Sequence, residues 1–153
     1  MIQIGERGVY IARVDNTAFT TARTLVQYNA ASTNVAAILQ VGLTFNSTTS
    51  TAIRLRLSKR TTAGTGTSFT LIRFSGHPTA LGSATNNHSA EGTLGDVLFD
   101  DFVNYLEPGK PMLLPIPEGR ITLAPSERIA LDFPSAPAAS ITLSAHILCA
   151  EIG

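Results

Sequence analysis

The sequence has a single cysteine and little charge. With Cys149 alone, the chain can form neither an intramolecular disulfide nor a thiolate cluster around a metal. Charged residues make up 14% of the chain, where about 25% is usual in soluble domains, and the formal net charge is zero. Because surface charge normally keeps soluble domains apart, we expect much of the surface to be covered by sister subunits or another partner.

Lysines are also scarce, and the sequence shows no long apolar run and no signal-peptide pattern in its first ten residues. Nine arginines and two lysines are spread along the chain and balanced by eleven acids, so no basic stripe is available for nucleic acid. No stretch of about 20 apolar residues is present to span a bilayer. The start, "MIQIGERGVY", lacks the basic and apolar regions of a signal peptide. We therefore expect no nucleic acid, no membrane association, and synthesis in the cytoplasm.

The sequence does contain apolar and polar residues that alternate at the period of a β-strand. In residues 53–57, aliphatic residues alternate with Arg54 and Arg56, which predicts a strand with its aliphatic side chains inward. The closing segment 141–149 alternates in the same way, with Cys149 on the apolar face. Both segments are typical of strands with one face in a core.

Residues 53–57 and 69–74 are joined by "KRTTAGTGTS", which suits a hairpin. Gly64 and Gly66 would supply the positive φ that such a turn uses. The same glycines resemble a phosphate-binding loop only weakly, because no lysine follows them and the flanking segments read as strands. We interpret this loop as a connection between strands.

Further strands are indicated over 24–30, over 35–45 and in the proline-punctuated last third of the chain. About eight short strands without a βαβ rhythm predict an all-β fold, a two-sheet sandwich of jelly-roll type over residues 24–153. Residues 75–95 are rich in glycine and poor in bulky apolar residues, which predicts one long loop. Residues 96–107 fit either a short helix or a strand.

The first 23 residues are apolar but irregular. Two interpretations remain open for residues 1–23: an ordinary first strand, or an N-terminal arm that packs on another subunit. If they form an arm, deletion of residues 1–20 should weaken attachment to a partner and leave the rest folded.

Groups that could carry out a reaction are few. His77 and His88 share the predicted loop with acidic residues but lack metal-ligand spacing, and we interpret both as solvated loop residues. His146 falls on the outward face of the last strand. No G-x-S-x-G motif presents a nucleophile. We therefore expect no enzyme activity, no cofactor and no metal.

Arginines on the outer face of the predicted hairpin form a candidate contact patch. Arg54, Arg56 and Arg73 would lie together if residues 53–57 pair with 69–74. Such a patch is either a solvated strand face or a docking face for an acidic protein surface, since the arginine fork pairs well with carboxylates.

The order of these segments resembles a known family. "IRLRLSKRTTAGTGTSFTLIRFSGHPTALGSAT", then "LLPIPEGRITLAPSERIALDF", then "ITLSAHILCAEIG" is similar to the trimeric jelly-roll decoration, or cement, proteins of tailed-bacteriophage capsids. The resemblance covers residues 24–153 and includes the segments Arg60–Gly66 and Ala124–Leu131.

The resemblance implies a homotrimer that binds the major capsid protein lattice on the outer surface of the virion and stabilises the shell. An alternative from another class is a receptor-binding or carbohydrate-binding jelly-roll module of a phage fibre, with residues 75–95 as its site. That segment contains no aromatic residue, although sugar-binding sites usually use one as a platform. The residues expected to make subunit or capsid contacts are Ile4, Val9, Tyr10, Ile11, Phe19, Arg54, Arg56 and Arg73.

Overall fold

The computed structural model describes residues 6–46, 52–74, 76–104, 111–114 and 121–153. These residues form twelve strands and no helix. The strands are β1 (Glu6–Phe19), β2 (Arg23–Asn29), β3 (Val35–Phe45), β4 (Ala52–Arg60), β5 (Thr65–Phe69), β6 (Ile72–Arg73), β7 (Ser83–Ala90), β8 (Leu94–Asn104), β9 (Pro111–Leu113), β10 (Ile121–Leu123), β11 (Arg128–Phe133) and β12 (Ile141–Ile152).

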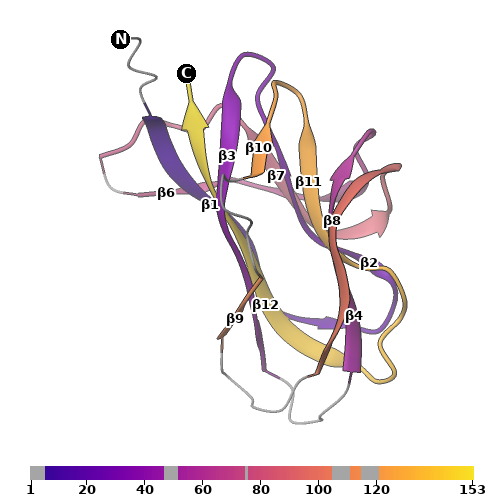
Figure 1. The fold of residues 1–153 in the computed structure, drawn as a ribbon. Helices are drawn as coiled ribbons and strands as arrows, with labels where there is room; N and C mark the ends of the chain where they lie inside the picture. The colour runs from indigo at the N-terminus through magenta and orange to yellow at the C-terminus, as the bar shows by residue number, and fades with distance from the viewer. Residues whose placement is uncertain (1–5, 47–51, 75, 105–110, 115–120) are drawn as a thin grey trace.

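Two sheets pack face to face (Figure 1). One has the order β10-β3-β12-β1-β6, with β9 paired to β3, and the other has the order β5-β7-β2-β11-β4-β8. The pairing is nested: β1 pairs with β12, β2 with β11, β3 with β10, and β4 with β8. A chain that folds back on itself in this way and alternates between two sheets is a jelly roll. The predicted fold class is confirmed.

The core lies between the sheets and is built from the inward side of each strand. In β12, the alternating apolar residues from Ile141 to Cys149 are all buried, as the period of two predicts. Phe19 and Phe133 meet edge to face, with ring centroids 6.0 Å apart and planes at 89°. This geometry is one that aromatic pairs prefer, and it connects β1 of one sheet to β11 of the other.

Residues 6–19 are a strand of the sandwich. β1 lies between β12 and β6, and Tyr10, opposite Cys149, is fully buried. The strand contains an irregularity between Val14 and Thr17, where Asn16 has a positive φ of 41°. Of the two interpretations left open for this region, the described part follows the first-strand one.

Three predictions about the middle of the chain are wrong. β4 and β5 lie in one sheet but are separated by β11, β2 and β7, so residues 53–74 are not a hairpin. Among the described glycines, only Gly76 has a positive φ, so Gly64 and Gly66 do not act through a left-handed backbone. Residues 75–95, predicted as a loop, contain β7, and the segment that fitted helix or strand is β8.

Candidate contact site on the edge strand β8

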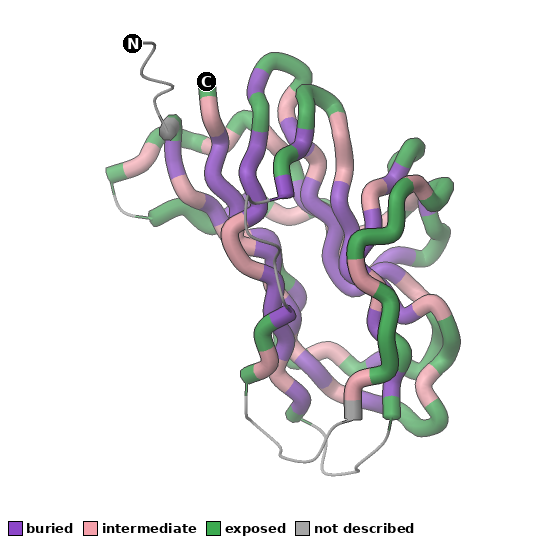
Figure 2. The backbone as a smooth tube through the Cα atoms, viewed as in Figure 1, coloured by how far each residue is buried: buried purple, intermediate pink, exposed green. Residues whose placement is uncertain are grey.

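Strand β8 is the outer edge of its sheet and carries exposed apolar side chains. It pairs with β4 on one side, and the described residues place no strand on its other side. Figure 2 shows this strand exposed along most of its length. The large exposed apolar side chains are Leu94 (42%), Val97 (46%), Leu98 (40%) and Phe102 (66%). A long apolar edge that no described strand covers is a place where another chain can add, so β8 is the candidate contact site.

The two faces of β8 explain why its sequence pattern was ambiguous. Phe99 lies opposite Leu57 and packs against the core, whereas Phe102 lies opposite Arg54 and is mostly exposed. A register shift between Leu57 and Ser58 interrupts the alternation. Apolar residues therefore occur on both faces of β8. The sequence shows no strict period of two, which is why it also fitted a helix.

Arg54 supports this edge through an ion pair with Asp100. Its Nε and Nη2 donate to the two carboxylate oxygens at 2.7 and 2.8 Å. These hydrogen bonds hold the pKa of Asp100 below its usual value. Asp101, the next residue, is exposed and has no ion pair with any described residue. After the Arg54 pair is formed, the edge therefore still carries negative charge.

Behind β8, a buried ion cluster ties β4 to β11. The Asp132 carboxylate lies 2.5 Å from Arg56 Nη2 and 3.0 Å from Arg60 Nη2. The side chains of Asp132 and Arg60 are each only 2% exposed, and Arg56 is 17% exposed. Glu91 Oε2 also lies 3.6 Å from Arg60 Nη2. Two carboxylates thus face two guanidinium groups on the outer side of this sheet, and Asp132 is the one that contacts both.

The connection between β7 and β8 covers this cluster. Glu91 accepts hydrogen bonds from the backbone N–H of Thr24, at 2.6 Å, and from the Thr24 hydroxyl. Arg60 Nη1 donates to the carbonyl of Gly92 at 3.1 Å. A side chain at Gly92 would overlap the carbonyl oxygen of Thr62. The glycine therefore allows the connection to lie directly on the strand end.

The predicted arginine patch does not form. Arg54 and Arg56 lie on β4, but Arg73 lies on β6, which belongs to the other sheet. Arg56 is engaged with Asp132 within the chain. The patch was inferred from a hairpin between 53–57 and 69–74, and nested pairing places those segments apart.

The predicted N-terminal contact residues divide into three groups. Tyr10 and Phe19 are 0% exposed and belong to this chain's own core, so the expectation that they contact another subunit is wrong. Val9 and Ile11 are half-buried on the opposite face of β1. Ile4 lies outside the described residues.

His88 is buried, contrary to its interpretation as a solvated loop residue. Its Nε2 lies 2.8 Å from the Thr85 hydroxyl, and the side chain is enclosed where β5 meets β7. Side chains at Gly64 or Gly66 would overlap the His88 ring. The glycine-rich segment is therefore the surface against which the histidine packs. His77 differs, because its Nδ1 accepts a hydrogen bond from the Val9 N–H at 2.8 Å.

We expect His88 to make the fold less stable in mild acid. Burial is the main cause that lowers the His88 pKa below 6.5, and Arg60 acts in the same direction while Glu91 opposes it. The unfolded chain then binds the proton more readily, so stability falls as pH drops from about 6.5 toward the lowered pKa, by at most about 1.4 kcal/mol per pH unit.

Urea unfolding at pH 7.5, 6.5 and 5.5 measures this effect. A His88→Gln variant should show a smaller loss of unfolding free energy over this range than the wild type. The pH slope of a His146→Gln variant is measured beside it, because burial also lowers the pKa of His146 and this histidine acts on stability in the same direction. Equal pH slopes in the wild type and His88→Gln would contradict the expectation.

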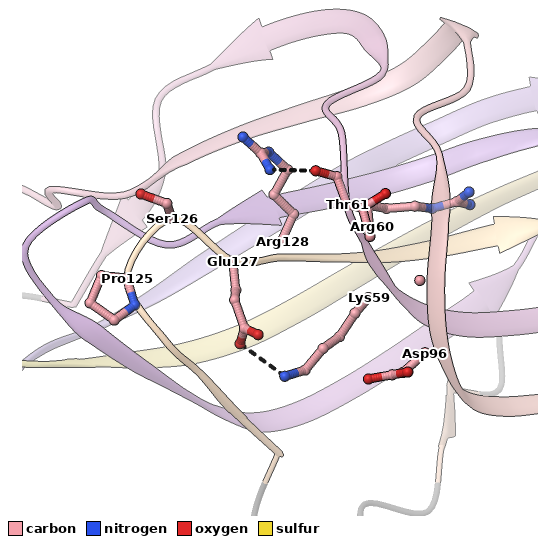
Figure 3. Close-up of a pocket in the computed structure, with 9 residues that line it drawn as sticks. Lys59, Arg60, Thr61, Asp96, Pro125, Ser126, Glu127 and Arg128 are labelled. Carbon is pink, nitrogen blue, oxygen red and sulfur yellow. Dashed lines mark hydrogen bonds and ion pairs between the residues drawn. The ribbon is translucent and has the colours of Figure 1, made fainter.

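A pocket of about 380 Å³ lies where the end of β4 meets the starts of β8 and β11 (Figure 3). Lys59 Nζ lies 2.8 Å from Glu127 Oε2, and Arg128 Nη1 donates to the Thr61 carbonyl at 3.3 Å. The hydrogen bond from Lys59 is the main cause that holds the pKa of Glu127 below its usual value. Lys59 and Glu127 thus neutralise each other, Arg128 donates to a backbone carbonyl, and Asp96, which also lines the pocket, has no ion pair with a described residue. We assign no ligand to this pocket.

Comparison with family models, curated proteins and solved structures finds no match to this chain. Among the described residues, no three histidine, cysteine, aspartate or glutamate side chains are grouped so as to hold a metal ion. The same part of the chain includes no helix that could cross a membrane. The site is therefore interpreted from its own geometry.

Proposed function

We propose that this chain is a non-enzymatic structural protein of a virion: a decoration protein that binds the outer surface of a phage head as a homotrimer and stabilises it. The observation that supports this most directly is the apolar edge of β8, on which the described residues place no strand, in a chain with little charge. Such an edge is costly to leave in water and is normally covered. The resemblance of residues 24–153 to capsid decoration proteins suggests that the partner is a capsid lattice.

The stabilising mechanism is mass action. A protein that binds the assembled shell, and not its separated subunits, shifts the equilibrium toward the shell by its binding free energy. Three linked copies attach with a high effective concentration after the first contact. No reaction and no bound cofactor are needed for this function.

Two measurements test the proposal. Sedimentation equilibrium should give three times the chain mass, and the purified protein should co-sediment with empty phage shells and raise their melting temperature. A protein that remains a single chain at high concentration and leaves shells unbound would overturn the proposal.

A Phe102→Asp variant tests the role of the edge. Because Phe102 is 66% exposed, the substitution should leave the monomer folded while it places a charge in the apolar contact. We expect the variant to lose trimer formation or shell binding by at least about tenfold. Leu81→Asp is the matched control, since Leu81 is 47% exposed and lies outside β8.

The alternative of a receptor-binding or carbohydrate-binding module has less support. It requires residues 75–95 to form a binding loop, and much of that segment is β7, hydrogen-bonded between β5 and β2. Binding on a glycan array that is abolished by substitutions in this segment would favour the alternative.

A further inference from the structure

A second apolar edge lies on the far side of the sandwich from β8. β6 is the edge strand of the other sheet and pairs with β1 at Tyr10 and Ile11. Ile72 is 38% exposed and Phe74, directly after the strand, is 47% exposed. Arg73 lies between them. We call the three residues Ile72, Arg73 and Phe74 the β6 corner.

The β8 edge and the β6 corner carry opposite charge. On β8, Asp96 and Asp101 are exposed and have no ion pair with a described residue. At the β6 corner, Arg73 has no ion pair with a described residue, and its guanidinium donates only to the His77 carbonyl at 3.4 Å. Each edge therefore combines exposed apolar side chains with charge that no described residue balances through an ion pair.

The two edges face away from each other. β1 packs against β2 and β7, so its neighbour β6 lies on the side of the sandwich opposite β8. Figure 1 shows β6 and β8 on opposite sides of the molecule. A contact between two different surfaces is head-to-tail, and such contacts close into a ring when the rotation per subunit allows it and extend into a filament when it does not. The proposed trimer therefore requires the two surfaces to meet with a rotation of the subunits.

Pairing of β8 with β8 of a second copy is less favourable. It would bring the two sets of acidic residues, Asp96 and Asp101, to the same contact, and like charges across a strand pair are destabilising. A β6 corner in that place instead offers a cation and two apolar side chains. Complementary charge also fixes the orientation of the partner.

We propose that the β8 edge of one copy binds the β6 corner of the next copy of this chain. Asp101 faces Arg73 on one face of the paired strands, and Phe102, on the other face of β8, covers Ile72 and Phe74. This inference rests on the proposed homotrimer, and it identifies the surfaces through which the copies meet.

Charge exchange on the full chain tests the contact. The single variants Asp101→Arg and Arg73→Asp each replace an attraction with a repulsion, and each should raise the dissociation constant of the oligomer at least about tenfold. The double variant Asp101→Arg/Arg73→Asp restores opposite charges and should recover assembly to within about threefold of the wild type. Sedimentation equilibrium over a range of concentrations provides the readout.

A matched control reverses an ion pair away from both edges. Arg13 and Asp15 form an exposed pair on β1 at 2.7 Å, so Arg13→Asp/Asp15→Lys changes the same kinds of charge without touching β8 or the β6 corner. This control should assemble like the wild type. The milder Asp101→Asn variant should weaken assembly less than Asp101→Arg. It provides a second test of the same residue if Asp101→Arg does not fold. Circular dichroism checks the fold of all variants.

The outcomes separate this contact from its competitors. If Asp101→Asn strengthens assembly and Arg73→Asp has no effect, β8 pairs with itself and the inference is wrong. If no single charge variant alters the wild-type oligomer, the subunits meet elsewhere and the inference is also wrong. Shell binding is scored separately: charge rescue with no shell binding would retain the contact and reject the decoration function.

Discussion

An Asp132→Ala variant is expected to lose about 3–5 kcal/mol of unfolding free energy. Asp132 is the carboxylate that lies between Arg56 and Arg60, and its side chain is 2% exposed. Removal of the carboxylate leaves two guanidinium groups without their shared partner, one of them almost fully buried. The penalty comes from buried positive charge that has lost its nearest carboxylate, with only Glu91, 3.6 Å from Arg60, to offset it in part, so the loss is much larger than the worth of a surface ion pair.

Urea unfolding followed by circular dichroism, at one fixed protein concentration, measures the loss. Asp100→Ala is the matched control, because it also removes a carboxylate from an arginine on β4, but from the solvent-exposed Arg54. We expect little change in stability there. Similar losses in the two variants would show that the Asp132 cluster is not behaving as a buried charge.

A Phe19→Ala variant should lose a comparable amount, about 3–5 kcal/mol. Phe19 is fully buried and its ring packs edge to face against Phe133 of the other sheet. Truncation leaves a cavity between the sheets. For the same reason, deletion of residues 1–20 should prevent folding, because it removes β1 from the middle of a sheet, and the expectation of a folded remainder is corrected.

Unfolding of Phe19→Ala and Ile11→Ala side by side distinguishes core from contact roles. Ile11 is half-buried on the outer face of the same strand. Its replacement by alanine should therefore lower the unfolding free energy clearly less than Phe19→Ala does. A Phe19→Ala protein with wild-type stability and weakened assembly would support the subunit-contact role that the structure rejects.

Sequence reasoning succeeded where a strand has one face in the core. The alternation in 53–57 and 141–149 predicted which side chains are buried, and the structure confirms both, with Cys149 as a small core residue. A period of two is a local property and is visible in a single stretch of chain. The two-sheet architecture followed from the number of such stretches and the lack of helical ones.

It failed where position depends on partners distant in sequence. Residues 53–57 and 69–74 read as a hairpin because they are close along the chain, whereas β4 pairs with β8 and β11. β7 was missed because its residues are small and polar, and it is held by pairing on both sides. The spacing of Gly64 and Gly66 was visible, but not the histidine that packs on them.

The charged residues of the site show the same division. Arg54 was placed on the outer face of its strand, but its partner Asp100 could not be chosen from the several acids of the chain. Asp132 stands at an outward position of the alternating stretch "RIALDF". The alternation indicates a polar position there, but it does not indicate that the side chain is buried. Burial there depends on the connection between β7 and β8 lying over the sheet, which no local pattern encodes.

The position of β12 has a consequence for biosynthesis. β12 is the last strand of the chain, yet it lies between β1 and β3, with Tyr10 opposite Cys149. This sheet can therefore close only after residues 141–152 have been synthesised, and pairings between segments so distant in sequence form slowly. Until those residues are available, β1 and β3 lack their central neighbour, so this sheet is the late-forming part of the sandwich and its strand edges are open to non-native pairing in that interval.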